Sequence, residues 1–278
     1  MSACGLTPAV PCEPRSLRTI LCTRGGLFGA LVLKTLSACD RIELCGIVRS
    51  SRWFHPALGV LGGSRAYIRR SGLSYSMYLL CATALGDALR GLGKGGRVPL
   101  RTRPGGIPVH TTPDINGPDA LEFLRNRRPE LLVSAFFDQR LHAPALAVAT
   151  QASVNIHPSL LPAFKGVDPV LRARLQGVEC GVTVHYMTPV LDSGAILAQR
   201  SVALSKGTSV FAATAHCFQA GAELLVAEID RVALGPVGAP QPAPGSYQSW
   251  PSAGDIRALR AQGGALIRFS DLRQIVSA

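Results

Sequence analysis

Asn155 and His157 are the residues whose types and spacing most directly suggest chemistry. They alternate with Val154 and Ile156 in the run Ser-Val-Asn-Ile-His-Pro. Side chains of a strand alternate between its two faces, so the amide and the imidazole should share one face. Pro158 cannot donate a backbone hydrogen bond to a sheet, so the strand should end at His157. The sequence therefore predicts an amide donor beside an imidazole at the carboxyl end of a strand, where open α/β sheets bind ligands.

Asp192 is the third polar residue of interest, in the run Val-Leu-Asp-Ser-Gly. A carboxylate can orient an imidazole or accept a proton through it. Each residue taken alone also has an ordinary structural interpretation. Asparagine is common in caps and turns, a histidine before proline is usually a satisfied polar group, and Asp-Ser-Gly is a common turn.

The elements that must position these residues alternate between strand and helix. Predicted strands lie at Leu17–Thr23, Ile42–Val48, Ile107–His110, Glu130–Ala135 and Val182–Met187. Predicted helices lie at Leu27–Ala38, within Asp114–Arg127 with Gly117-Pro118 as the start signal, at Pro169–Gln176 and at Val210–Val232. This alternation predicts an α/β fold, Rossmann-like, with a mainly parallel sheet and helices on both faces.

Composition limits the class of protein. A chain of 278 residues with 47% apolar content can bury one good core. Its eight cysteines form no Cys-x-x-Cys pair and no zinc-type spacing, which predicts reduced thiols and no metal. The N-terminus lacks the features of a secretory signal. The apolar stretches 27–36 and 75–85 are shorter than the roughly 20 residues that cross a bilayer, so we expect a soluble, cytoplasmic protein without a membrane partner.

Positive charge is concentrated in an insertion at about residues 50–105. The stretch from Arg49 to Arg103 contains ten basic residues and one acid, Asp87, within a chain of net charge +12. This indicates either an anionic partner, such as RNA, a phosphate-bearing substrate or an acidic carrier, or simply a solvated basic face. A possible apolar helix face in the same insertion contains Tyr67, Tyr75, Tyr78, Leu79 and Leu80 and is more typical of core or lid packing than of a cofactor site.

A change of composition after Gly235 suggests a boundary. Prolines 236, 240, 242 and 244 lie among alanines and glycines. We therefore expect a catalytic domain at residues 1–235 and a proline-rich linker with a short tail at 236–278, packed on the main body.

These motifs together resemble the 10-formyltetrahydrofolate-dependent formyltransferase family. The resemblance is carried by the runs Asn-Ile-His-Pro-Ser-Leu-Leu-Pro-Ala-Phe-Lys-Gly at 155–166, Gly-Val-Thr-Val-His at 181–185 and Leu-Asp-Ser-Gly at 191–194, and it covers about residues 17–232. The family includes methionyl-tRNA, glycinamide-ribonucleotide and sugar-amine formyltransferases.

The resemblance implies that Asn155, His157 and Asp192 are catalytic. Formyl transfer to an amine passes through a tetrahedral oxyanion. Asn155 and His157 would stabilise that charge, and Asp192 would orient His157 or take the proton of the amine. The resemblance also implies 10-formyltetrahydrofolate as formyl donor and no metal. The donor's pterin would lie between two loops, with candidate contacts at Phe136, Phe137, Gln139, Leu141, Val190 and Leu191. His185 would lie behind the catalytic residues.

Departures from the family pattern bear on the acceptor. The turn Thr23-Arg24-Gly25-Gly26 lacks the phosphate loop of glycinamide-ribonucleotide enzymes, and about 45 residues after Leu234 do not supply the C-terminal barrel of methionyl-tRNA enzymes. We therefore expect a small amine acceptor, either free or linked to a nucleotide or carrier, with Arg24, Arg49 and Asp168 as candidate contacts. Two alternatives are a methionyl-tRNA-type enzyme without that domain and a non-catalytic binding module on the same fold. Oligomeric state does not follow from the sequence.

Overall fold

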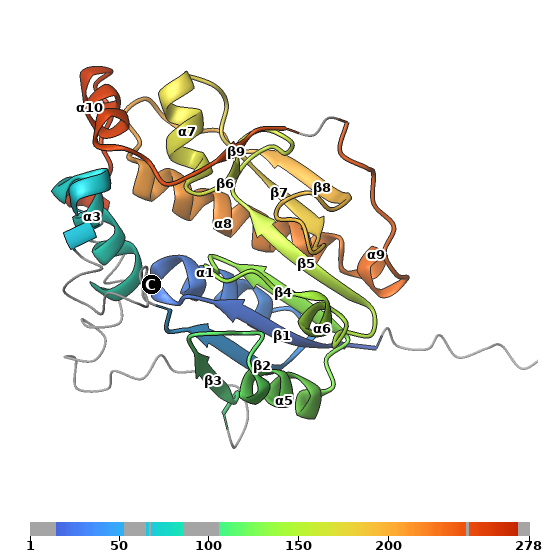
Figure 1. The fold of residues 1–278 in the computed structure, drawn as a ribbon. Helices are drawn as coiled ribbons and strands as arrows, with labels where there is room; N and C mark the ends of the chain where they lie inside the picture. Colours follow the sequence, from blue (N-terminus) through green and yellow to red (C-terminus); the bar gives the residue numbers. More distant parts are fainter. Residues whose placement is uncertain (1–14, 53–64, 67, 86–105, 243–244, 272–278) are drawn as a thin grey trace, which may run out of the picture.

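A seven-stranded sheet forms the centre of the protein, seen in a computed structural model that describes residues 15–52, 65–66, 68–85, 106–242 and 245–271 (Figure 1). The strand order is β3 (Val109–Thr112), β2 (Ile42–Ser50), β1 (Leu17–Thr23), β4 (Leu131–Ala135), β5 (Ala152–His157), β7 (Gly181–Tyr186) and β8 (Ile196–Ser201). The first five strands run parallel, and β7 and β8 are antiparallel additions. The predicted α/β fold with a mainly parallel sheet is confirmed.

Helices cover both faces of the sheet. Helices α1 (Gly26–Ser37) and α8 (Val210–Ala227) pack together on one face, and α5 (Pro118–Arg127) and α6 (Ala143–Leu146) cover the other (Figure 1). Each face of the sheet has its own hydrophobic core, because successive side chains of a strand point to opposite faces. Leu21 belongs to one core, and its neighbours Ile20 and Cys22 belong to the other.

Among the described residues, α8 is the one helix that is long and apolar enough to cross a bilayer, and it is longer than the apolar stretches 27–36 and 75–85. It is followed at once by α9 (Ile229–Ala233), so the single helix predicted for 210–232 is two. Within α8, 67% of the apolar window is buried inside the protein. This burial is what a core helix of a domain shows, and its apolar character is explained by packing on α1 and the sheet.

Part of the basic insertion lies outside the described residues, and so do Tyr67 and five of the ten basic residues from Arg49 to Arg103. The described part contains α3 (Leu73–Leu80), continued by a π-helical turn at Cys81–Leu85. Tyr75 and Tyr78 are buried, whereas Leu80 is 51% exposed, so the expected face does not include Leu80. The turn packs against the start of α1, where a Cβ on Gly26 would lie 2.0 Å from the Ala82 carbonyl oxygen.

The C-terminal segment packs on the main body. Its strand β9 (Tyr247–Gln248) pairs with β6 (Lys165–Gly166), and its helix α10 (Ala253–Ala261) contacts α3 and α7 (Pro169–Gln176) (Figure 1). A capping box formed by Ser252 and Asp255 starts α10. Neither β9 nor α10 is among the elements predicted from the sequence.

Candidate active site

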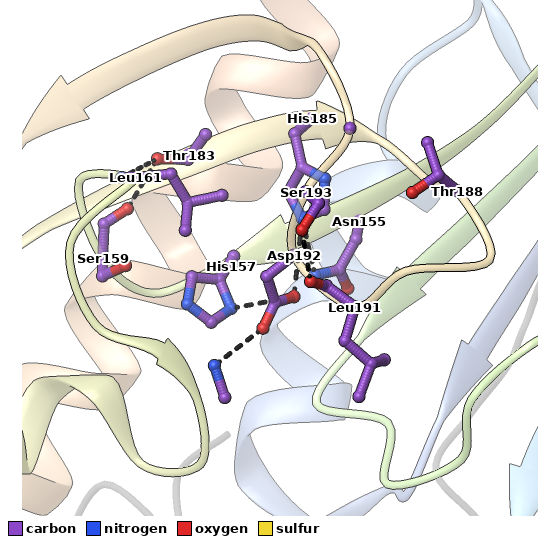
Figure 2. A network of polar contacts seen from close by, with 12 residues as sticks. Asn155, His157, Ser159, Leu161, Thr183, His185, Thr188, Leu191, Asp192 and Ser193 are labelled. Carbon is purple, nitrogen blue, oxygen red and sulfur yellow. Dashed lines mark hydrogen bonds and ion pairs between the residues drawn. The ribbon is translucent and has the colours of Figure 1, made fainter. Parts of the chain in front are cut away.

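Asn155, His157 and Asp192 meet at one edge of the sheet, together with His185 (Figure 2). Strand β5 ends at His157, as Pro158 predicts, and Val154 and Ile156 are buried in the core. The antiparallel register of β5 and β7 places Asn155 opposite His185. Cross-strand neighbours have Cβ atoms about 5 Å apart, so this pair can interact directly.

Both ring nitrogens of His157 face polar groups of the protein. Nε2 lies 3.0 Å from the Phe164 carbonyl oxygen, and a carbonyl oxygen can only accept, so Nε2 carries a proton. Nδ1 lies 3.6 Å from Oδ1 of Asp192. The ring is 5% exposed. The nitrogen that can exchange a proton at this site is therefore Nδ1, on the side of Asp192.

His185 has its tautomer fixed by the backbone. Nδ1 lies 2.9 Å from the Tyr186 carbonyl oxygen and donates to it, which leaves Nε2 as an acceptor. The Nδ2 atom of Asn155 lies 3.2 Å from this Nε2. Burial, and secondly the charge of neighbouring His157, lower the pKa of His185 to about 4. His185 is thus a neutral acceptor at physiological pH.

This contact orients the amide of Asn155. Because Nε2 of His185 accepts, it must face the NH₂ group of Asn155 rather than its oxygen. One N–H is used by His185, and the second is available to the cavity that Asn155 lines. A neutral N–H donor is therefore held in a fixed direction.

The loop that contains Asp192 is held by three groups that sequence reasoning missed. The Gly166 N–H donates to Oδ2 of Asp192 at 2.8 Å, and Nε2 of Gln241 donates to the carbonyl oxygens of Asp192 and Gly194, each at 2.9 Å. A Cβ on Gly194 would lie 1.8 Å from the Tyr186 carbonyl oxygen, so only glycine fits there. Gly166 and Gly194 stand inside recognised motifs, but no local signal connects Gln241 to this loop.

A cavity of about 380 Å³ opens beside these side chains. Its walls include all six residues predicted to contact the pterin, namely Phe136, Phe137, Gln139, Leu141, Val190 and Leu191, together with Asn155, His157, His185 and Asp192. The structure therefore brings the two predicted groups of residues to one cavity. Its mixture of apolar walls and a few converging polar groups is typical of a small-molecule site.

The six predicted contacts differ in what they can offer. Val190 and Leu191 are 62% and 43% exposed at the cavity rim, whereas Leu141 is buried. The side-chain amide of Gln139 is already bonded, donating to Ser50 Oγ and the Thr112 carbonyl oxygen. Gln139 therefore ties the ends of β2 and β3 together, and its side chain is not available to a ligand.

The three candidate acceptor contacts lie in different surroundings. Arg24 lines the cavity and forms a close ion pair with Asp138. Asp168 also lines the cavity. Arg49 packs against Gly25 and is not among the lining residues. Within the described part of the chain, no three His, Cys, Asp or Glu side chains cluster as metal ligands would.

The residues of this site lie in a region that is similar to one protein family. The family model for formyl transferase matches residues 112–229, which include Asn155, His157, His185 and Asp192. Methionyl-tRNA formyltransferase of Roseiflexus sp. (strain RS-1) is 40% identical over 138 residues, covering 49% of this chain and 42% of that protein. The chain thus spans less than half the length of the curated relatives it matches.

Two solved structures share the fold. A sugar N-formyltransferase from a Shewanella species has a TM-score of 0.55 at 16% identity, covering 87% of this chain and 79% of that one. A phosphoribosylglycinamide formyltransferase from Anaplasma phagocytophilum has a TM-score of 0.52 at 16% identity, covering 84% of this chain and all of that one.

Proposed function

Since the formyl transferase family model matches residues 112–229, we propose that this chain transfers a formyl group from 10-formyltetrahydrofolate to an amine. The observation that carries the proposal is the convergence of Asn155, His157 and Asp192 on one cavity (Figure 2). The proposed enzyme is an N-formyltransferase whose acceptor amine is a small molecule.

The cavity suits a flat, partly apolar donor. Phe137 and Leu141 supply apolar walls on one side, and Val190 and Leu191 supply them on the other. Backbone N–H and C=O groups of the two loops would read the ring edge. When bound, the donor would supply an activated formyl carbonyl.

Asn155 is proposed as the oxyanion donor. Attack of an amine on a formyl carbon puts negative charge on its oxygen, and a fixed N–H aimed at that charge stabilises the transition state. The second N–H of Asn155 has this property, because His185 holds the amide through the first. No reorganisation of the amide is then needed during the reaction.

His157 and Asp192 are proposed to manage the proton. The attacking amine must lose a proton when the new N–C bond forms, and N10 of the folate must gain one when the old N–C bond breaks and tetrahydrofolate leaves. Oδ1 of Asp192 lies 3.6 Å from Nδ1 of His157, and Oδ2 is fixed by the Gly166 N–H. Asp192 can accept the proton directly or through a water, and a doubly protonated His157 would add positive charge beside the oxyanion.

The experiment is transfer of an isotope-labelled formyl group from 10-formyltetrahydrofolate to a panel of amines, followed by mass spectrometry. We expect at least one labelled amide product, and expect His157→Ala to reduce it by about 10²-fold or more. An unchanged product level in His157→Ala would remove the assigned role of His157. Absence of donor consumption with every amine would favour the binding-module alternative.

Transfer to an aminoacyl-tRNA is a second candidate, favoured by relatives named methionyl-tRNA formyltransferase. Such an acceptor would bring phosphates, and binding to basic residues would fall steeply with salt. A tRNA affinity that does not change between low and high salt would exclude it.

We also propose three further properties of the protein. They are a catalytic domain at 1–235 followed by the segment 236–278, a cytoplasmic location, and an anionic partner for the basic insertion, such as RNA or an acidic carrier. The described contacts of α10 with α3 and α7 support treating the final segment as part of the same compact unit.

A further inference from the structure

Asp168 lies in the cavity wall close to the proposed reaction centre. It follows Gly166, whose N–H holds Asp192, by two residues, and two residues span at most about 7 Å of chain. Asp168 has a left-handed backbone (φ 51°, ψ 55°) at the N-cap position of α7. Such conformations are unfavourable for residues with a Cβ and often mark functional positions.

The carboxylate of Asp168 is only partly satisfied. The Tyr75 hydroxyl and the Leu171 backbone N–H hydrogen bond to it, but Oδ2 is buried and has no partner among the described residues. Arg172, one turn along α7, uses Nη1 on Asp255 at 3.1 Å and Nη2 on the Ser249 carbonyl oxygen at 3.0 Å, while its buried Nε has no partner among the described residues. A buried acceptor without a donor is expected to receive one from a ligand.

Two buried aromatic rings lie next to this carboxylate. Tyr75 is completely buried and Tyr78 is 3% exposed, and their ring centroids are 5.5 Å apart. Both line the same cavity as Asp168. Aromatic faces attract cations, as a carboxylate does, and both repel anions.

We propose that Asp168, Tyr75 and Tyr78 form a subsite that binds the positively charged amine of the acceptor, carried on an apolar arm, before it loses its proton. The assignment of the bound amine as acceptor rests on the proposed function. Asp168 is then a specificity-determining residue that favours amines with uncharged flanks over amines next to a phosphate or carboxylate.

The start of α1 supports this selectivity. In a βα unit the first N–H groups of the helix can bind a phosphate. Here the Ala82 backbone packs against Gly26, leaving no room even for a Cβ, so the described part of the insertion narrows the space at this helix start.

Amine binding should depend on the charge of Asp168. Burial raises the pKa of Asp168 to about 6, against the lowering effects of the hydrogen bonds from Tyr75 and the Leu171 backbone and of the charge of Arg172. The titratable groups that face it are Tyr75 and Tyr78 from α3 and Arg172 from α7, and α8 contributes the hydroxyl of Thr214 next to Tyr78. Burial also raises the pKa of Tyr78 well above 10, so the carboxylate is the group that changes charge between pH 5 and 7.

The test is calorimetric titration of the whole chain, with and without tetrahydrofolate, using 3-methylbutylamine and its neutral isostere 3-methylbutan-1-ol. We expect the amine to bind at least tenfold more tightly than the alcohol at pH 7.5. The difference should vanish in Asp168→Asn and decrease severalfold at pH 5 in the wild type. Asp230→Asn, which removes a largely exposed carboxylate far along the chain, should keep it.

Equal affinity for the two probes, no binding of the amine, or an amine preference that persists in Asp168→Asn would overturn the proposal. If Asp168→Asn does not fold, the pH dependence of the wild type decides, and a flat profile overturns the proposal. Tetrahydrofolate binding is measured separately. A protein that prefers the amine but does not bind tetrahydrofolate would contradict the proposed function and leave the cation subsite in place.

Discussion

The NH₂ group of Asn155 lies 3.2 Å from Nε2 of His185, a histidine directly opposite it on the neighbouring strand. Nε2 of His185 can only accept, because the ring proton is on Nδ1, which donates a hydrogen bond to the Tyr186 carbonyl oxygen. One buried imidazole therefore fixes the direction of the amide that we propose as the oxyanion donor. His185 is a positioning residue in this account.

Replacing Asp192 by asparagine should remove the proton acceptor. The change keeps the size of the side chain but leaves no carboxylate opposite Nδ1 of His157. We expect kcat for formyl transfer to fall by about 10²–10⁴-fold with little change in affinity for tetrahydrofolate. Steady-state kinetics and a binding titration measure the two effects. Asp230→Asn is the matched control, and a kcat within twofold of wild type in Asp192→Asn would refute this role.

Stability should fall with acid partly because of His185. Its pKa is lowered in the folded state from 6.5 to about 4, so the unfolded chain binds the proton first. The contribution of neutral His185 to the free energy of unfolding is complete above pH 6.5. As the pH falls from 6.5 toward 4, this free energy decreases by about 1.4 kcal/mol per pH unit.

Asp168 acts in the opposite sense. Its pKa is raised to about 6 in the folded state, so its contribution is complete below pH 3.8 and is lost as the pH rises through 6. Denaturant unfolding of the wild type and His185→Gln between pH 4 and 7 separates the two, since Asp168 cancels in the difference. A constant difference across this range would contradict the assigned protonation of His185.

Gly26→Ala should separate α1 from the π-helical turn that packs on it. The added Cβ would lie 2.0 Å from the Ala82 carbonyl oxygen, on a backbone with φ of +67°. Gly177→Ala is the control, because Gly177 has φ of +63° and open space around it. We expect Gly177→Ala to lower Tm by about 2–4 °C through backbone strain alone. Gly26→Ala should lower it clearly further, and equal shifts in a thermal melt would show that the contact is unimportant.

Gln241→Ala should loosen the loop of Asp192 without touching a ligand. Gln241 donates to the carbonyl oxygens on both sides of Ser193, and its loss leaves the carboxylate less fixed. We predict a reduction of kcat of about tenfold, smaller than for Asp192→Asn, because positioning rather than chemistry is lost. Gln262→Ala removes a comparable side-chain-to-backbone bond elsewhere and should leave kcat unchanged. A kcat for Gln241→Ala equal to that of Gln262→Ala would show that the clamp has no catalytic effect.

Local signals were sufficient for much of the fold. Pro118 and Pro169 stand at the first positions of α5 and α7, and the predicted starts of both helices agree with the structure. Strand β8 was missed, since its outer half is exposed and its sequence Ile-Leu-Ala-Gln-Arg-Ser is weakly patterned. The capping box at Ser252 was readable but lay in a segment dominated by prolines and glycines.

The sequence predicted those residues of the site that lie in short motifs. Asn155, His157 and Asp192 lie in short motifs, and the structure brings them together. The contact between Asn155 and His185 depends on the register of β5 against β7, which sequence spacing does not give. Tyr75 reaches Asp168 only through tertiary packing of α3, so its role in the cavity required the structure.

A double-mutant cycle on Asn155 and His185 tests the central claim most directly. Single-turnover formyl transfer would be measured for Asn155→Ala, His185→Gln and the double variant, with His216→Ala, on the exposed side of α8, as control. If His185 acts through Asn155, then Asn155→Ala costs about 10²–10³-fold, and adding His185→Gln costs little more. If the rate reduction in the double variant equals the product of the two single-variant reductions, the two residues act independently and the account is contradicted.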